Sequence, residues 1–580
     1  MAFRALAGAA ALALAPTAGQ AACKVEKYAD LPVTMDGFQP MVRAKINGVD
    51  TSFIIDSGAF YSMMAPGVAG AAKLRLERTP DEFRVTGIGG SIRPSIARVK
   101  DLIVAGIPVH NIEFFVGGTD TGTAGLLGQN VLGVGDVEYD LPDGFVRLMR
   151  SHDCGGTDLA YWANGGSYSL VRIDPRDATD QPFTMATVYV NGTAMHATFD
   201  TGATRTIMSL QAAARIGIKP DSKGVKPAGY GNGIGRGISQ TWLAPVASIR
   251  IGDEEIHNPS VLIGDAGGDT DMLIGADFFI SHRVYVDNSA HRMFFTYTGG
   301  ELFGRSARAG AQAPMAAAAP AGAIEPKDAD GFSRRGAVFA AQHDRIRALA
   351  DFGRAIELAP KDPRYRVQRA EALLADDHKT EALADLDAAI AADPANLSAL
   401  IDRAALRIED KKFDDAIRDA DAAARAAPPT VAEHFQIGGL YEEAHAYGPA
   451  IEQFRLWIAA HPDDAQLPEA LNARCWTRAL ANQALDQALD DCNAALRLRP
   501  HTPSFLDSRG LVRVRMGQWD KAIADYDEAL KAEPKIAWSL YGRSIARRHK
   551  GLAAEATADV AAAVAIDKDL PDRAKKDGID

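Results

Sequence analysis

Cysteine is scarce in this chain, which has four among 580 residues. No two of them form a Cys-x-x-Cys pair, so the sequence indicates neither a zinc motif nor a dithiol redox centre. Positive charge is also in deficit, since 63 Lys and Arg residues stand against 75 Asp and Glu residues. The net charge of -12, with no block of basic residues, argues against a nucleic-acid partner.

The chain also lacks hydrophobic runs long enough to span a membrane. The apolar stretch at residues 5–15 is too short for that purpose. It follows Arg4 and precedes Gly19 and Ala21, two small residues with the spacing of a signal-peptide cleavage site. We therefore expect a signal peptide over residues 1–21, export to the periplasm or out of the cell, and no stable membrane span afterwards. An uncleaved membrane anchor is the alternative.

The four cysteines fall into two pairs along the chain. Cys23 and Cys154 lie at the two ends of the first β-rich unit described below, and Cys475 and Cys492 lie 17 residues apart in the helical part. An even number of cysteines in an exported protein indicates disulfide bonds. We predict the pairs Cys23–Cys154 and Cys475–Cys492.

The first half of the chain repeats itself. The sequence FIIDSGA at residues 53–59 returns 144 positions later as ATFDTGA at residues 197–203. In both copies an Asn-Gly pair between apolar segments precedes the motif, which is typical of a β-hairpin with a type I′ turn. Short predicted strands and Gly-rich turns follow each motif. We predict two related β-rich lobes, at residues 22–155 and 156–303.

The second half of the chain differs from the first in composition and periodicity. Residues 304–329 are rich in Ala, Pro and Gly and predict a flexible linker. Beyond them the sequence is Ala-rich, and proline recurs at steps of 34 residues with a single step of 38. These prolines are Pro360, Pro394, Pro428, Pro462, Pro500 and Pro534.

A 34-residue period resembles the tetratricopeptide repeat, in which each unit is a pair of helices. The clearest unit carries the family's small, aromatic and proline positions as Gly510, Trp519, Ala522, Tyr526, Ala529 and Pro534. The resemblance implies about seven repeats over residues 330–570, followed by a tail at residues 571–580. A solenoid of this kind has a concave face that suits a peptide or protein partner.

The repeated Asp-Ser/Thr-Gly-Ala motif resembles the active-site turn of retropepsin-like (retroviral-type) aspartic proteases. The resemblance covers about residues 36–150 and 182–298. It includes two apolar residues and a glycine before a short predicted helix, LLGQN at residues 126–130 and LIGAD at residues 273–277. The fold class is therefore predicted as multidomain β + α, with two β-rich acid-protease lobes in tandem followed by an all-α tetratricopeptide solenoid.

The resemblance implies a catalytic pair, Asp56 and Asp200. Peptide hydrolysis by water needs a general base and a general acid, and two adjacent carboxyl groups that share one proton supply both. No cofactor and no metal ion are needed. The neighbouring residues Ser57, Gly58, Thr201 and Gly202 are predicted to brace the two turns.

The Gly-rich segments that follow the two motifs correspond to the flaps that cover the substrate in this family. The predicted flap and substrate-binding residues are Gly87, Gly89, Gly90, Tyr230, Gly231 and Gly233. For Tyr230, a simple place in a turn is as good an interpretation as a role in covering the substrate. The sequence thus predicts an aspartic-type endopeptidase that acts on a peptide or protein substrate.

Several alternatives remain at the level of sequence. An Asp-Thr-Gly triplet alone is weak evidence, because a third copy at residues 120–122 follows glycines and not a strand. The lobes could be a catalytically silent peptide-binding scaffold, since a fold does not establish activity. The enzyme could also cleave its own linker near Pro314 and Pro320. The two lobes are expected to face each other within one chain, although each could instead pair with its twin in a homodimer.

Overall fold

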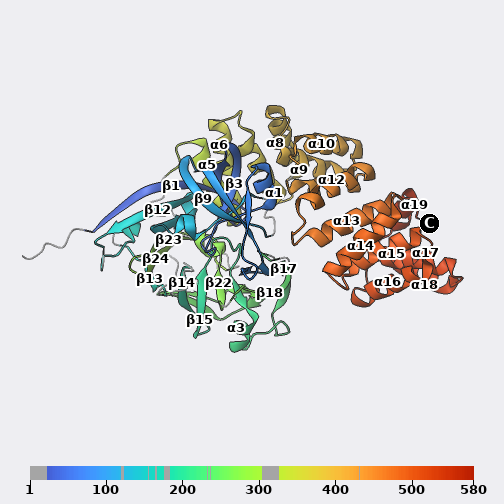
Figure 1. Ribbon diagram of the computed structural model, residues 1–580, viewed down its shortest axis with the longest axis horizontal. Coiled ribbons are helices and arrows are strands. Elements are labelled where there is room, and N and C mark those ends of the chain that lie inside the picture. Colours follow the sequence, from blue (N-terminus) through green and yellow to red (C-terminus); the bar gives the residue numbers. More distant parts are fainter. Residues whose placement is uncertain are drawn as a thin grey trace, which may run out of the picture.

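The computed structural model describes residues 23–118, 123–154, 156–163, 166–174, 183–231, 233–235, 237–268, 270–303, 325–429 and 431–579. The predicted signal peptide, the Asp-Thr-Gly triplet at residues 120–122 and the predicted linker up to residue 324, with Pro314 and Pro320, lie outside the described residues. In Figure 1 the β-rich part forms one end of the molecule and the helices extend from it to the C-terminus.

The β-rich part consists of two lobes. Lobe 1 contains β1 (Lys24–Asp36), β2 (Gln39–Ile46), β3 (Val49–Ile55), β4 (Met63–Met64), α1 (Pro66–Ala71), β5 (Leu76–Arg78), β6 (Val85–Gly87), β7 (Gly90–Ile92), β8 (Ser95–Val104), β9 (Ile107–Val116), β10 (Gly125–Leu127), α2 (Gln129–Leu132), β11 (Asp136–Asp140), η1 (Leu141–Asp143) and β12 (Phe145–His152). Lobe 2 contains η2 (Tyr161–Ala163), β13 (Ser169–Arg172), β14 (Met185–Val190), β15 (Thr193–Phe199), β16 (Ile207–Ser209), α3 (Leu210–Arg215), β17 (Lys226–Gly231), β18 (Ser239–Pro245), β19 (Ser248–Ile251), β20 (Glu254–His257), β21 (Ser260–Gly264), β22 (Met272–Ile274), α4 (Ala276–Phe279), β23 (His282–Asp287) and β24 (Arg292–Tyr297).

The two predicted hairpins open each lobe's repeated unit. Strand β2 pairs with β3 in antiparallel register, and β14 pairs with β15 in the same way. The turn residues Asn47 and Gly48 have φ angles of 49° and 86°, and Asn191 and Gly192 have φ angles of 50° and 77°. A type I′ turn needs positive φ at both central residues, so the predicted turn type is confirmed in both copies.

Strands of the two lobes join in one sheet, in the order β13-β24-β23-β11-β12-β1. The junction is the antiparallel pair β11–β23, where Val137 lies opposite Val286. Glu138 is fully buried at this junction and accepts ion pairs from Arg147 of lobe 1 and Arg283 of lobe 2, each at 2.6 Å. A buried carboxylate needs such charged partners. Because Glu138 has one partner in each lobe, its ion pairs connect the two lobes.

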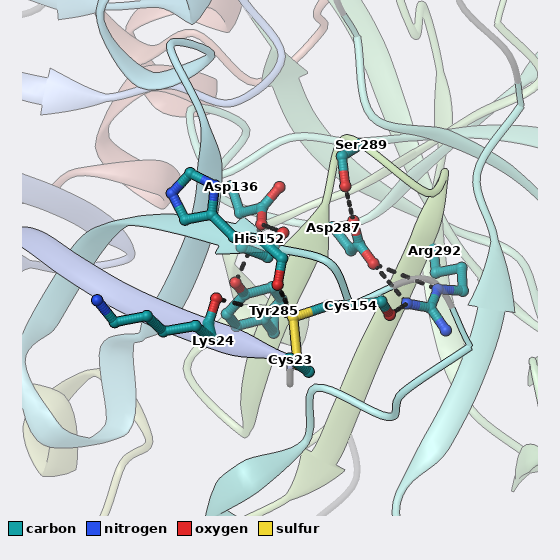
Figure 2. The surroundings of a disulfide bond; sticks show 10 residues. Cys23, Lys24, Asp136, His152, Cys154, Tyr285, Asp287, Ser289 and Arg292 are labelled. Atoms are coloured by element: carbon teal, nitrogen blue, oxygen red, sulfur yellow. Dashed lines mark hydrogen bonds and ion pairs between the residues drawn. A yellow bond between two sulfur atoms is a disulfide. The ribbon is translucent and has the colours of Figure 1, made fainter. Parts of the chain in front are cut away.

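Both predicted disulfides are formed. Figure 2 shows Cys23–Cys154, which links the start of β1 to the chain just after β12, where Asp287 pairs with Arg292 nearby. The other disulfide joins Cys475 to Cys492 across a helical hairpin. The prediction from cysteine positions is therefore confirmed.

The helical part is a series of seven antiparallel hairpins among the described residues. They are α5 (Ala329–Ala341) with α6 (Arg345–Leu358), α7 (Pro363–Leu374) with α8 (Lys379–Ala392), α9 (Leu397–Glu409) with α10 (Phe413–Ala426), α11 (Glu433–Glu443) with α12 (Tyr447–Ala460), α13 (Leu467–Leu480) with α14 (Leu485–Leu498), α15 (Pro503–Arg515) with α16 (Trp519–Ala532), and α17 (Ala537–His549) with α18 (Ala553–Ile566). The predicted repeat solenoid is confirmed as a fold. None of these helices, nor any other in the described ranges, has the length and apolar character to cross a membrane.

The segment that was predicted as a C-terminal tail is not extended chain. It contains α19 (Leu570–Lys576), whose Leu570 and Ala574 are buried, together with Ile579, against the last hairpins. Residues four apart lie on the same helix face, so Leu570 and Ala574 give this short helix an apolar side. The helix covers the end of the last repeat, as a capping element of a solenoid must.

A recurring ion pair was missed in the sequence. In six of the seven hairpins an arginine of the first helix binds a largely buried aspartate of the second. The pairs are Arg335–Asp351, Arg369–Asp385, Arg403–Asp419, Arg474–Asp491, Arg509–Asp525 and Arg543–Asp559. In the fourth hairpin the equivalent positions are Ile437 and Gln453, so both charges are replaced together.

The first hairpin of the solenoid packs directly on the lobes (Figure 1). Val338 of α5 and Phe352 of α6 belong to the same continuous core as the strands of both lobes. Gln342 donates from Nε2 to the carbonyl oxygen of Ile280 in lobe 2 at 2.5 Å, and the Arg334 guanidinium lies over the ring of Phe145 in lobe 1. The start of the solenoid is thus held by both lobes at once.

Candidate active site

Each of the two predicted catalytic aspartates stands at the end of a buried strand. Asp56 follows β3 and Asp200 follows β15, and each strand pairs in parallel with the apolar strand of the later motif, β10 or β22. The backbone N–H of Asp56 donates to the carbonyl oxygen of Leu127 at 3.0 Å, and that of Asp200 donates to Ile274 at 2.9 Å. These two bonds hold the backbone of each aspartate at the end of its strand, and so they fix the position from which its carboxyl group projects.

The two turns brace each other through their hydroxyl residues. The N–H of Ser57 donates to Oγ1 of Thr201 at 3.0 Å, and the N–H of Thr201 donates to Oγ of Ser57 at 2.9 Å. Each hydroxyl also donates across the lobes, from Ser57 to the carbonyl oxygen of Phe199 at 2.8 Å and from Thr201 to that of Ile55 at 2.7 Å. Both side chains are buried. The four hydrogen bonds run in both directions between the two turns and connect the lobes.

The carboxyl groups of Asp56 and Asp200 lie side by side within one chain, close enough to affect each other's pKa. Each also accepts from its own turn, since Gly58 N–H donates to Asp56 at 2.9 Å and Gly202 N–H donates to Asp200 at 2.8 Å. A Cβ on Gly58 would lie 2.3 Å from Cγ of Asp200, and a Cβ on Gly202 would lie 2.4 Å from Cγ of Asp56. Only glycine permits this approach.

Burial raises the pKa values of both carboxyl groups. Burial is the main cause for Asp56, and the adjacent Asp200 carboxylate raises the pKa of Asp56 further. Burial also raises the pKa of Asp200, while hydrogen bonds from Asp56 and from the turn amides partly offset this. Two carboxyl groups in this relation hold one proton between them over a wide pH range, and the titration belongs to the pair.

A second layer of side chains supports the two turns and was missed in the sequence. In lobe 2 Thr206 donates from its N–H and Oγ1 to the buried Asp277, at 3.0 and 2.7 Å, and burial raises the pKa of Asp277 to about 6. In lobe 1 Ser62 and Asn130 make the equivalent bonds at 2.8 and 2.7 Å. Both pairs follow the internal duplication, so a position-by-position comparison of the two copies would have found them.

The glycine of the later motif lies against each turn. A Cβ on Gly128 would come within 2.6 Å of the carbonyl oxygen of Ala59, and a Cβ on Gly275 within 2.8 Å of that of Ala203. The N–H of Gly128 donates to the Ser62 hydroxyl at 3.0 Å, which links this motif to the second layer. The short helices α2 and α4 can therefore pack close under the aspartates.

The predicted flaps meet over the site. Hairpin β6–β7 of lobe 1 touches the loop after β17 of lobe 2, where Gly235 N–H donates to Ile88 at 3.0 Å and Gly237 N–H donates to Gly89 at 2.8 Å. The N–H of Gly89 also donates to Asp265 at 3.2 Å. Of the predicted flap residues, four line the cleft and two, Gly89 and Gly90, form the tip of the lobe 1 hairpin. The four are Gly87, Tyr230, Gly231 and Gly233.

A cleft of about 1820 Å³ lies between the flaps and the two aspartates. Its walls come from both lobes and, beyond them, from the first helices of the solenoid. The solenoid residues in the wall are Glu371, Ser398, Ile401, Asp402, Ala432, Glu433, Phe435, Gln436, Trp457 and Gln466. The aspartates therefore stand at the floor of a large cleft built by three parts of the chain.

Comparison with known families identifies the two lobes separately. Residues 42–134 match the family model described as "gag-polyprotein putative aspartyl protease", and residues 186–278 match the one described as "Aspartyl protease". Each match contains one of the two aspartates, Asp56 or Asp200. No match to a curated protein is found.

Solved structures of repeat proteins resemble the helical part. One is YrrB, described as a TPR protein with an unusual peptide-binding site, with 19% identity over 33% of this chain and 97% of that chain and a TM-score of 0.29. Another is a tetratricopeptide repeat protein from Parabacteroides merdae, with 16% identity over 43% of this chain and 98% of that chain and a TM-score of 0.34.

Proposed function

Because this chain carries two aspartyl protease domains in tandem, we propose that it is an aspartic-type endopeptidase whose catalytic pair is Asp56 and Asp200. The observation that carries the proposal is the close approach of these two carboxyl groups, each against the glycine of the other turn, in the lining of a large cleft. The reciprocal bonds of Ser57 and Thr201 support it, since they hold two turns from different lobes in one fixed arrangement.

In the proposed reaction the pair acts with a single proton. The ionised carboxylate takes a proton from a water molecule, which attacks the carbonyl carbon of the peptide bond. The protonated carboxyl group donates its proton to the carbonyl oxygen, which gives a neutral tetrahedral intermediate. Collapse of this intermediate transfers a proton to the departing nitrogen and breaks the C–N bond. No covalent bond to the enzyme forms, and neither aspartate is assigned a fixed role.

The cleft dimensions favour a polypeptide over a small molecule. Pockets for small ligands have volumes of about 300–1,000 Å³, which is well below the volume of this cleft. An extended peptide would lie between the aspartates and the flaps and would form main-chain hydrogen bonds with the flap strands. The solenoid would then recruit the protein that contains this peptide.

We also propose that the protein acts outside the cytoplasm, in the periplasm or beyond. The two disulfides are compatible with an oxidising compartment. The sequence pattern of residues 1–21 supports export, as argued above. Detection of the mature N-terminus after expression with the native leader would test this, and a mature protein that keeps residues 1–21 would contradict it.

The test of activity is a peptide-library digest at several pH values between about 3 and 8. The comparison proteins are Asp56→Asn, Asp200→Asn and, as a matched control, Asp253→Asn, which changes an exposed carboxylate in a turn of lobe 2. Cleavage by the wild type and the control, with loss in both dyad variants, supports the proposal. Cleavage that persists in the dyad variants refutes the catalytic pair, and a wild type that binds peptides without cleaving them supports the silent scaffold.

A further inference from the structure

The cleft above the dyad does not end with the protease lobes. Helices α7, α9 and α11, each the first helix of its hairpin, form one of its walls, beside lobe 1. The first hairpin holds this wall in place because it packs on both lobes. One continuous cavity therefore contains the two aspartates and the inner face of the solenoid.

This solenoid wall is rich in carboxylates that have no cationic partner. Glu371 of α7, Asp402 of α9 and Glu433 of α11 line the cleft, and Asp36 at the end of β1 lines it as well. Within the described ranges no ion pair or side-chain hydrogen bond is made by these four side chains, whereas the aspartates of the hairpin interfaces bind arginine. Among the described residues that line the cleft, none of the solenoid residues is an arginine or lysine, and the basic residues of the lobes are Arg84 and Arg205.

The carboxylates affect one another. Surrounding protein atoms reduce the hydration of Glu371, whose side chain still reaches solvent, and together with the charges of Asp402 and Asp36 they raise its pKa to about 7. Enclosure alone raises the pKa of Asp402 to about 6. A positive charge placed among them would relieve this repulsion, so the cavity is complementary to a cation.

Apolar side chains and uncharged polar side chains also line the solenoid wall of the cleft. Phe435 of α11 is half-buried, packs against Trp457 at 5.7 Å between ring centroids, and lines the cleft near Ile401 of α9. The side chains of Ser398 and Gln436 add hydrogen-bonding groups to the same wall. The aliphatic part of a lysine or arginine side chain packs well on such apolar patches while its charge meets the carboxylates.

We propose that this wall is a substrate exosite, which receives a Lys- or Arg-containing segment of the same polypeptide whose scissile bond lies over Asp56 and Asp200. The inference rests on the proposed endopeptidase function and specifies its substrate class. The occupant is the substrate chain itself, because the wall is continuous with the cleft of the dyad and its charge complements a basic segment.

The cleavage test compares two peptides that share one core sequence cleaved by the wild type. One carries a flanking Lys/Arg-Gly extension and the other a Ser-Gly extension of equal length. We expect a ratio of kcat/KM of about 10 in favour of the basic peptide at low ionic strength and pH 7.5, where Glu371 and Asp402 are mostly ionised, from several exposed ion pairs. The ratio should fall to about 1 in the double variant Glu371→Gln with Asp402→Asn, and also at about 0.5 M salt.

A matched control keeps this test specific. The double variant Glu555→Gln with Asp572→Asn removes the same two charges from exposed positions near the C-terminal end of the solenoid, and it should leave the ratio unchanged. A ratio that is equal in the wild type and in the wall variant overturns the exosite. A basic peptide that binds the wall without changing the cleavage ratio also overturns it, because the occupant would then be a separate partner.

A binding measurement separates the exosite from catalysis. Fluorescence anisotropy at pH 7.5 with a labelled Lys/Arg-Gly peptide is measured on Asp56→Asn/Asp200→Asn protein, with and without the two wall substitutions. About 10-fold weaker binding in the wall variant supports the exosite even if no peptide is ever cleaved. Equal binding refutes the exosite while leaving the proposed catalytic function intact.

Discussion

The reciprocal bonds between the two active-site turns make a quantitative prediction for Thr201→Val. Valine has nearly the shape of threonine but removes the hydroxyl, which accepts from Ser57 N–H at 3.0 Å and donates to the Ile55 carbonyl at 2.7 Å. Both orphaned groups remain buried. At about 1–3 kcal/mol for each of these two unsatisfied buried polar groups, the free energy of unfolding of the lobes should fall by about 2–6 kcal/mol.

The same substitution should lower activity. The two bonds hold the turns of Asp56 and Asp200 in register, and a misplacement of about 1 Å at a catalytic group costs roughly 100-fold in rate. Calorimetry of the full chain should show the lobe transition shifted down by roughly 5–10 °C. Peptide cleavage below that temperature should show kcat reduced far more than KM is changed.

Thr201→Ser is the matched control, because it keeps the hydroxyl and loses only a methyl group. We expect it to retain most of the stability and activity. A double-mutant cycle with Ser57→Ala should give a clear coupling energy, since the two residues bond to each other. The reasoning is refuted if valine and serine at this position behave alike, or if the cycle is additive.

Three further predictions concern the dyad, the flap and the solenoid. Burial raises the pKa values of Asp56 and Asp200 above those of the unfolded chain, so the stability that the pair contributes is present at low pH and is lost as pH rises through the raised values. The melting temperature of the wild type should therefore fall more steeply with rising pH, above the ordinary aspartate pKa of about 4, than that of the double Asn variant. Gly89→Ala should weaken flap contact and raise KM, since its φ is +81° and the new Cβ would lie 2.3 Å from a carbonyl oxygen of the opposite flap; a KM equal to that of the wild type would count against this. Replacement of Cys475 and Cys492 by serine should destabilise the solenoid by about 3 kcal/mol, measured by the loss of helical circular dichroism on heating, and an unchanged transition would contradict it.

Local patterns in the sequence were sufficient for several parts of this structure. The Asn-Gly pairs give both hairpins because positive φ at two successive residues suits Asn and Gly and matches the twist of the flanking strands. The 34-residue period gives the hairpins of the solenoid because each unit must bury the same face against its neighbour. Cysteine position relative to these elements was sufficient for both disulfides.

Other features depend on pairings between distant segments, which local patterns do not contain. Nothing in the alternation of β11 or β23 indicates that these two strands join the lobes, because an apolar strand face fits many partners. The contact between the flap tips involves glycine backbone and leaves no side-chain signal. The Arg–Asp pairs of the solenoid are different, since their regular spacing was present in the sequence and was overlooked.

The solenoid and the protease lobes are less separate than a linker between them suggests. Glu325 and Asp328, the last residues before α5, already bond to that helix, and Val338 and Phe352 share the core of the lobes. The first hairpin packs against both lobes, and this packing holds the solenoid wall of the cleft in position relative to the two aspartates. The first hairpin thus serves as the fixed base from which the remaining repeats extend, so any substrate held on α7, α9 or α11 is presented to the dyad in a defined direction.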